Sequence, residues 1–474
     1  MATLNMAFDI ATNALEADQS ALNIVSNNVA NASTPGYTRE VANWQENDPV
    51  TINGISYGQG AQVTGPVSQR DRVLEQSLQQ QDQVASASTA RLTALDQLQS
   101  IFSQVTTANS SSSTAATNGI SQDLAAFFDS LSQLESSPSD NSLRQQVLTS
   151  AANLAGDFQA ASSQLSGQQT SLDQQSTSLI TQINTLTQSI ANLNLEIQSA
   201  SPNSDAGTLE DQRQQDLTQL SQLIGIHQIQ TEDNGLTITT SSGALLVSEG
   251  KSYSLTTGPL GGVTHFFDAE GNDITTALAS GGGQIGGLIA VRDQDIPQVE
   301  NALDTLAFSL GTQVNTVNEA GSDANGNPGV VIFNLPGTSA GAAAAISVAV
   351  TDPSQIAAAA SGQGSLDDTN LLAMANLQNQ AIVAGSTPAN YFSDFISALG
   401  SLVSGVSTQN AAQQASVTQL QNQVDSLSSV DLNEEASAME TLEQSYQAAS
   451  KIFTILDSVM TSALNLGVPT AYTS

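Results

Sequence analysis

The two ends of the chain carry matching apolar stripes. Each stripe repeats at alternating spacings of three and four residues, which is the heptad pattern of a coiled coil. The N-terminal stripe comprises Leu4, Phe8, Ala11, Leu15, Leu22, Val25 and Val29, and only Asp18 interrupts it. The C-terminal stripe comprises Met439, Leu442, Tyr446, Ala449, Phe453, Leu456, Met460 and Ala463. Neither end has enough apolar neighbours to bury its stripe, so we predict that the two terminal helices pair with each other or with other subunits.

Helical and extended patterns alternate between these ends. Pro35 and Gly36 end the first helix, and a strand-like stretch with regular glycines follows to about residue 65. A helical period then returns, is broken by a Ser/Thr/Ala linker at 107–118, and reaches its longest run over 143–197. At 1.5 Å per residue this run predicts a helix of about 80 Å, unless Gly156 or Gly167 kinks it.

The period changes to two after residue 225. Two alternating runs flank Asn234-Gly235, which predicts a β-hairpin because this dipeptide supplies the positive φ angles of a tight turn. More short strands are expected to about residue 274, then a helix over 295–319 and a second β-leaning segment over 321–365. The order predicts a mainly α protein with a β-rich insertion, built as a discontinuous, multi-domain rod.

Three discontinuous domains follow from this order. The first is a terminal coiled-coil domain with a β-like extension, made from 1–70 and 430–474. The second is a long-helix bundle made from 71–225, 288–320 and 366–429. The third is a β-rich outer domain made from 226–287 and 321–365.

Composition excludes several classes of partner. The chain has 9 Lys and Arg against 44 Asp and Glu, a net charge of -35, so it lacks the basic clusters that nucleic acid binding requires. An anionic membrane surface is disfavoured for the same reason, and no apolar run reaches the length of a membrane span. There is no cysteine. The first 20 residues lack the basic and apolar regions of a secretory signal, so we expect any export to proceed without cleavage.

Motifs that resemble active sites are better explained as turns. Residues 281–286 match G-x-G-x-x-G without the preceding strand that a dinucleotide site needs. Residues 337–341 match G-x-S-x-G, but no histidine follows the serine, as a hydrolase would require. Asp323, Asn325 and Asn327 begin like a calcium loop, although Pro328 replaces its essential glycine. With only His227 and His265 besides, we predict no catalytic residues, no metal site, no cofactor and no enzyme activity; the lone Trp44 is expected to pack.

One block near the N-terminus carries a family resemblance. Residues 21–39, which end in Tyr37-Thr38-Arg39, resemble the opening motif of bacterial flagellar rod, hook and hook-associated proteins. The motif positions are Asn28, Ala30, Asn31, Thr34, Pro35, Gly36 and Tyr37. Internal segments are also similar, and these are Gly65-Pro66-Val67 with Arg70-Asp71-Arg72, residues 209–213 before 223–225, and residues 286–293 through 317–321. The tripeptide ending is most similar to the hook-associated members at the hook-filament junction.

The resemblance implies a structural, extracellular role. Family members leave the cell through the flagellar type III export apparatus without a cleaved signal, are escorted by an export chaperone, and assemble at the growing tip. It implies self-assembly as a ring, with the hook protein on one side and a second junction protein on the filament side. The segment from 321 to 366 is short, which leaves little room for the extra outer domain of some members.

Two other functions remain open from sequence. One is a hook or distal-rod subunit, although the long heptads over 143–197 argue against it because those relatives contain more β-structure. The other is a secreted enzyme or adhesin that acts through the β-rich domain.

Overall fold

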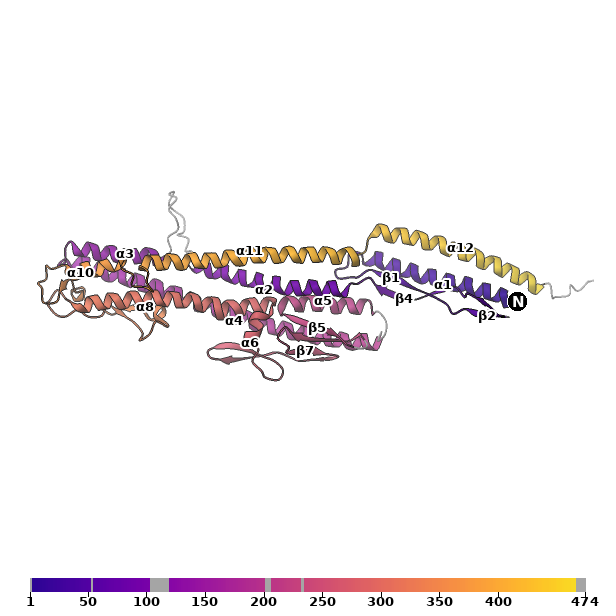
Figure 1. The fold of residues 1–474 in the computed structure, drawn as a ribbon, viewed down its shortest axis with the longest axis horizontal. Coiled ribbons are helices and arrows are strands. Elements are labelled where there is room, and N and C mark those ends of the chain that lie inside the picture. Colours follow the sequence, from indigo (N-terminus) through magenta and orange to yellow (C-terminus); the bar gives the residue numbers. More distant parts are fainter. Residues whose placement is uncertain (1, 53, 103–118, 201–205, 232–233, 466–474) are drawn as a thin grey trace, which may run out of the picture.

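The computed structural model describes residues 2–52, 54–102, 119–200, 206–231 and 234–465. It is a long rod in which most helices run lengthwise (Figure 1). The helices are α1 Ala2–Asn31, α2 Arg72–Phe102, α3 Gly119–Glu135, α4 Asn141–Ala200, α5 Thr208–Leu223, α6 Thr275–Gly281, α7 Gly283–Ala290, α8 Ile296–Ala320, α9 Ala342–Ala345, α10 Thr369–Ala375, α11 Pro388–Ser428 and α12 Leu432–Asn465. A π-helical turn, Val291–Asp295, joins α7 to α8, and short 3-10 turns lie at Pro353–Gln355 and Asn376–Asn379.

The strands form small antiparallel sheets. They are β1 Glu40–Glu46, β2 Val50–Ile52, β3 Ile55–Tyr57, β4 Ala61–Ser68, β5 Ile226–Gln230, β6 Leu236–Thr240, β7 Leu245–Ser248, β8 Lys251–Ser252, β9 Thr256–Leu260, β10 Val263–Phe267, β11 Gly321–Ser322, β12 Phe333–Asn334, β13 Ser347–Val348 and β14 Ala359–Ala360. The largest sheet has the order β5-β6-β7-β8. The mainly helical, multi-domain fold is therefore as the sequence predicted.

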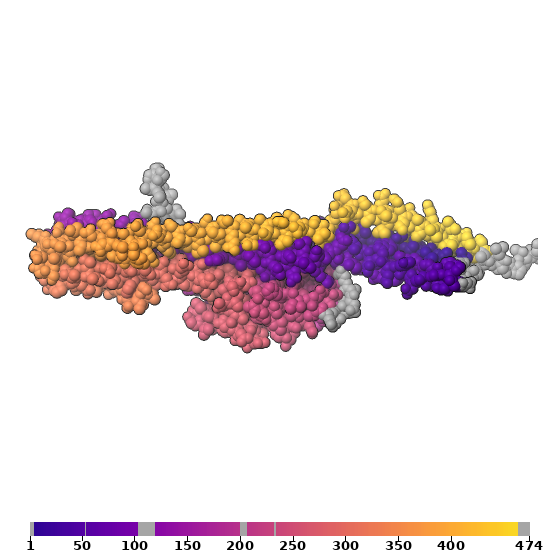
Figure 2. Space-filling model, in the orientation of Figure 1, coloured from indigo at the N-terminus to yellow at the C-terminus, as the bar shows by residue number. Residues whose placement is uncertain are grey.

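The rod has three parts along its length. Helices α1 and α12 pair at one end, with the β1–β4 ribbon lying along α1 (Figure 1). The long helices α2, α4, α8 and α11 form the shaft, with α3 and α10 at its opposite end. The β5–β8 sheet bulges from one flank near the middle, as the space-filling view also shows (Figure 2).

The longest predicted helix is one continuous element. α4 spans 60 residues, about 90 Å at 1.5 Å per residue, and neither Gly156 nor Gly167 interrupts it. Asp140 caps its start, because the Asp140 carboxylate accepts hydrogen bonds from the backbone N–H groups of Ser142 and Leu143. The predicted linker at 107–118 lies outside the described residues.

The predicted β-hairpin forms between β5 and β6. These strands pair in register from Ile226 opposite Thr240 to Gln230 opposite Leu236, and Asn234 has the positive φ of 57° that the turn signal predicted. Gln83 of α2 donates from its side chain to the carbonyl of Ile226. The sheet is thus attached to the shaft through its β5 edge.

The second β-leaning segment, 321–365, differs from expectation. It forms only two-residue pairs, β11 with β14 and β12 with β13, and packs at the α3–α10 end of the rod, away from the β5–β8 sheet (Figure 1). Side chains of α8 satisfy its backbone instead of a sheet: Asn315 accepts from the N–H groups of Ile332 and Phe333, and Asn318 accepts from that of Ala357. The two β-leaning segments therefore do not join into one outer domain.

The continuous hydrophobic core belongs to the shaft and its sheet. Its fully buried side chains include Leu95, Leu98, Phe127, Leu154 and Phe158. The core extends into β6 and β7. Among the described residues, none from α1 or α12 belongs to this core. The terminal helix pair is therefore attached to the shaft by other means.

Candidate assembly site

The terminal helices α1 and α12 are antiparallel partners. The Phe8 and Phe453 rings meet with their centroids 4.6 Å apart, and near the other end of α1 the side chain of Asn28 binds that of Glu435. These two contacts fix the register between the helices. The structure thus brings the two predicted stripes onto one seam.

The seam residues are buried to different degrees by a single copy of the chain. Ala11, Val25 and Ala449 are buried, whereas Val29 is 39% and Tyr446 38% exposed. The half-buried members are Leu4, Phe8, Leu15, Leu22, Met439, Leu442, Phe453, Leu456 and Met460. The side chain of Ala463 lies outside the described residues. Much of the seam therefore keeps apolar surface that another subunit could cover.

Asp18 interrupts the seam in the structure as it does in the sequence. It is only 4% exposed, and its Oδ2 has no hydrogen-bond partner among the described residues. An unsatisfied buried carboxylate oxygen costs stability. The seam is thus not optimised as a self-contained coiled coil.

Exposed apolar side chains concentrate in this end of the rod. Of the 21 large hydrophobic residues that are exposed in the described chain, 13 lie within residues 1–73 or 427–465, which make up less than a quarter of the sequence. They include Trp44, Val50, Ile55 and Tyr57 on the ribbon and Ile452, Ile455 and Val459 on α12. Apolar surface of this extent marks an interaction site.

A polar joint fastens the helix pair to the shaft. Asn28 is 1% exposed and uses its whole amide: Nδ2 donates to the Glu40 carbonyl at 2.7 Å and to Glu435 Oε2 at 3.1 Å, while Oδ1 accepts from the Glu40 N–H and the Tyr37 hydroxyl. Arg39 donates from Nε to Glu435 at 2.7 Å and from a terminal nitrogen to Glu434 at 2.7 Å. Motif residues thus hold the first turn of α12.

The same segment also binds the shaft. The backbone N–H of Arg39 donates to the carbonyl of Ser428 at the end of α11, and that of Thr38 donates to Asp211 of α5. Arg70 forms an ion pair with the same Asp211. Arg72 pairs with Glu210, and Arg213 donates to Asn194 and to the Asn234 carbonyl. Four of the nine basic residues of the chain therefore gather at this joint.

Two titratable groups at the joint are shifted toward their neutral forms. Burial, together with Glu40, Asp211 and Glu435, raises the pKa of Tyr37, so its hydroxyl stays protonated and donates to Asn28. Burial raises the pKa of Glu75 from 4.5 to about 7, against the opposing charge of Arg70 at 3.6 Å. Asp211 and Glu210 raise the Glu75 pKa further, and Arg72 lowers it.

The remaining motif residues shape the turn after α1. Thr34 donates from its hydroxyl to Asn31, and Pro35 accepts from Gln215 of α5. Gly36 has φ 76°, a left-handed conformation that favours glycine, and a Cβ there would require the flexible Gln215 side chain to move. Ala30 is exposed.

Glu435 was not among the residues predicted from sequence, although it is central to the joint. The sequence marks Glu435 only as part of an acidic first turn of α12. There, Glu434 and Glu435 stabilise the helix because their charges interact favourably with the positive end of its dipole. Trp44, which was expected to pack, is instead 49% exposed.

The motifs that resemble active sites lie in turns. Gly282 and Gly283 have φ 95° and 71° and connect α6 to α7 without a preceding strand. Asp323 accepts from the backbone N–H groups of Asn325 and Asn327, which closes a tight turn. His265 binds Asp273 at 2.7 Å. In the described part of the chain, no three His, Asp or Glu side chains are grouped as a metal site would need.

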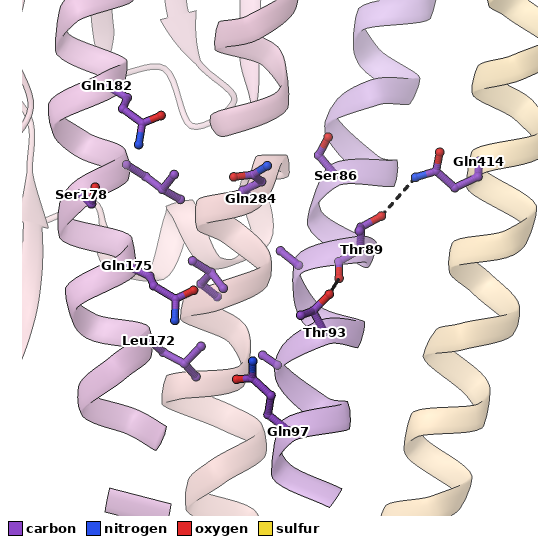
Figure 3. A pocket seen from close by; sticks show the side chains of 14 residues that line it. Ser86, Thr89, Thr93, Gln97, Leu172, Gln175, Ser178, Gln182, Gln284 and Gln414 are labelled. Atoms are coloured by element: carbon purple, nitrogen blue, oxygen red, sulfur yellow. Dashed lines mark hydrogen bonds between the residues drawn. The ribbon is translucent and has the colours of Figure 1, made fainter. Parts of the chain in front are cut away.

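A hollow of about 520 Å³ lies between α2, α4 and α7 (Figure 3). Amides and hydroxyls line it, including Gln97, Gln175, Gln182 and Gln284, above aliphatic residues such as Leu172. None of its lining residues is charged. It therefore offers hydrogen bonds but no general acid or base.

None of the described helices combines the length and apolarity needed to cross a membrane.

Comparison with known proteins gives one consistent result. The family described as the flagellar hook-associated protein FlgK helical domain matches residues 95–333, and the flagella basal body rod protein family matches residues 8–38. Flagellar hook-associated protein 1 of Escherichia coli (strain K12) is 25% identical, over 96% of this chain and 98% of its own. The Bacillus subtilis (strain 168) protein of the same name is 24% identical, over 98% and 99%. The structure of the flagellar hook junction protein FlgK from Burkholderia pseudomallei superposes with a TM-score of 0.65 at 20% identity, covering 73% of this chain and 98% of that one.

Proposed function

The chain belongs to the FlgK family of flagellar hook-associated proteins, and from that membership we propose that it is the structural adaptor that joins hook to filament. The matched helical domain spans half of the chain, which favours this role over a hook or distal-rod subunit. The family is structural, and the adaptor needs no chemistry.

The observation that carries the proposal is the exposed apolar surface at one end of the rod. A monomeric soluble protein rarely leaves so much apolar surface uncovered. The helix pair therefore serves as the assembly module, and several copies form a ring through it. The hook protein contacts this ring on one side and a second junction protein contacts it on the filament side.

The joint sets the angle between the helix pair and the shaft. Because α1 and α12 share no described residue with the shaft core, the angle between pair and shaft depends on the hydrogen bonds and ion pairs of Asn28, Arg39 and Arg70. A fixed angle holds the shaft and the β5–β8 sheet at a constant orientation outside the ring. The sheet then acts as a solvated outer knob.

Export follows from the same family membership. The protein passes in an unfolded form through the flagellar type III export apparatus, escorted by its chaperone, without a cleaved signal, and works outside the cell. A seam that one copy buries only partly is consistent with terminal helices that gain most of their stability on assembly.

Removal of residues 440–474 tests the proposal in the source bacterium. We expect the shaft to fold and the truncated protein to be exported, because the core is intact, but no protein to be incorporated at the hook tip and no filament to form. Immunolabelling of isolated hooks and electron microscopy of filaments provide the readout. Normal filaments on cells with only the truncated chain would refute the proposal.

A further inference from the structure

A second stripe runs along α12 beside the seam that faces α1. It consists of the residues that immediately precede successive seam positions, namely Ala438, Thr441, Ser445, Ala448, Ile452, Ile455 and Val459. The first four are small and the last three are large and β-branched. Ile452, Ile455 and Val459 are 54%, 62% and 48% exposed, so they form a ridge without a partner in the described chain.

The small half of this stripe borders a hollow of about 440 Å³, whose lining is mostly apolar but also includes Arg39, Glu40 and Glu435 of the joint. Ala438 and Thr441 form its α12 side, Ile24 lies on its α1 side, and Trp44 stands on the β1 side. The half-exposed indole of Trp44 resembles the aromatic anchors that dominate binding energy at protein interfaces. One helix pair thus carries both a ridge and a hollow.

The ridge and the small half of the stripe have the same spacing. Ile452, Ile455 and Val459 lie two heptads after Ala438, Thr441 and Ser445, respectively. A displacement of two heptads, about 21 Å along the helix, would place each large side chain of one copy on a small residue of the next. Alternating large and small residues in this way lets facing surfaces interdigitate.

Charge supports the same displacement. Lys451, one of the few cations of a strongly acidic chain, flanks the ridge. Two heptads earlier is Ser437, which lies one turn from Glu434, a carboxylate whose side chain is 61% exposed although Arg39 binds one of its oxygens. The displaced copies would therefore bring opposite charges together.

We propose that the α12 ridge of one copy docks in the Trp44 hollow of a second copy, with the two copies parallel and displaced by two heptads. The contact rests on the proposed self-assembly. The ridge presents anchors at i, i+3 and i+7, the pattern by which a helix occupies a groove. Because ridge and hollow are different surfaces, the contact is heterologous, and its displacement along the helix makes successive copies follow a helical path around the ring axis rather than a flat closed ring.

Engineered disulfides test the register directly, because the chain has no cysteine of its own. The matched pair is Ala438→Cys with Ile452→Cys in one chain, and the control pair is Ala438→Cys with Val459→Cys. Neither pair can close within one chain, because its members are about 20 Å or more apart along a straight helix. After oxidation of isolated flagella, we expect the matched pair to give disulfide-linked dimers and higher species at a several-fold higher yield than the control.

The outcomes separate the contact from the assembly. If both variants are incorporated at the junction and the matched pair links no better than the control, the docking contact is wrong while self-assembly stands. If the unmodified chain forms no ring or tube under electron microscopy, both the contact and the proposed self-assembly fail.

Trp44, the only tryptophan, gives a second test without cysteines. For purified full-length protein, we expect assembly to shift its emission to shorter wavelength and to weaken acrylamide quenching several-fold. Ile455→Ser should reduce both changes, whereas Thr454→Ala, on an exposed face away from the stripe, should not. Emission that is unchanged in visibly assembled protein would overturn the contact.

Discussion

Nε of Arg39 lies 2.7 Å from Oε1 of Glu435, although 396 residues separate the two in sequence. Glu435 is 1% exposed and also accepts from Asn28, so one carboxylate holds two motif residues of the N-terminal segment. This contact joins the first and last helices where both meet the shaft. The family motif therefore binds the first turn of α12 through Asn28 and Arg39.

Glu435→Ala should loosen the terminal module. The substitution leaves Arg39 Nε and one N–H of Asn28 without their acceptor, at a cost of about 2–3 kcal/mol. The matched control is Glu434→Ala, whose exposed ion pair is worth less than about 1 kcal/mol. Urea unfolding followed by Trp44 fluorescence measures both, since Trp44 lies on β1 of the same module. Equal midpoints for the two variants would show that Glu435 has no special role.

Glu75 should make stability depend on pH. Its pKa is about 7 in the folded chain and 4.5 when unfolded, so the folded state holds a proton that the unfolded state releases. The free energy of unfolding is therefore highest below pH 4.5 and falls as the pH rises. The fall is complete above about pH 7 and amounts to about 3 kcal/mol. Glu75→Gln should abolish this decline.

Unfolding by urea at pH 5 and pH 8, followed by circular dichroism, tests the effect. We expect Glu75→Gln to be more stable than the natural chain at pH 8 and similar to it at low pH. Asp96→Asn, an exposed carboxylate on the same helix, is the control and should leave the pH dependence unchanged. A Glu75→Gln variant that retains the full decline would contradict the assignment.

Local periodicity was sufficient to predict the helices and the hairpin, but not the contacts of the joint. Short-range patterns predicted the helices α1, α4 and α12 and the β5–β6 hairpin, and the structure contains each of these elements. The contact between Arg39 and Glu435 depends on how three distant segments meet, and no spacing in the sequence records that. The same limit explains Asp211, whose partners Thr38 and Arg70 lie far from it in sequence.

The backbone hydrogen bonds of the β-leaning segment at 321–365 could not be predicted from the sequence either. Its composition indicated strands, yet amide side chains of α8 hydrogen-bond to five of its backbone groups. Asn315 and Asn318 each replace hydrogen bonds that a neighbouring strand would have made. Such substitution of side chains for strands has no periodic signature.

The two histidines separate an adaptor from an enzyme. His227 is exposed, and the His265 ring has one hydrogen bond to the described residues, with Asp273. We therefore expect the double variant His227→Ala with His265→Ala to fold normally. On the adaptor interpretation the double variant supports full swimming motility in soft agar. A variant that is folded and exported but does not restore motility would indicate chemistry at the β-rich sheet.

The most direct test of the central claim compares two neighbouring residues of α12. Phe453 packs against the ring of Phe8 within the seam, whereas Thr454 is exposed. Phe453→Asp places a charge in the seam, and Thr454→Asp places the same charge in solvent. The measurement is the fraction of hooks that carry the immunolabelled protein at their tip. If the helix pair is the assembly module, Thr454→Asp should label hooks at the level of the natural chain and Phe453→Asp should label almost none. Equal labelling by the two variants would contradict the claim.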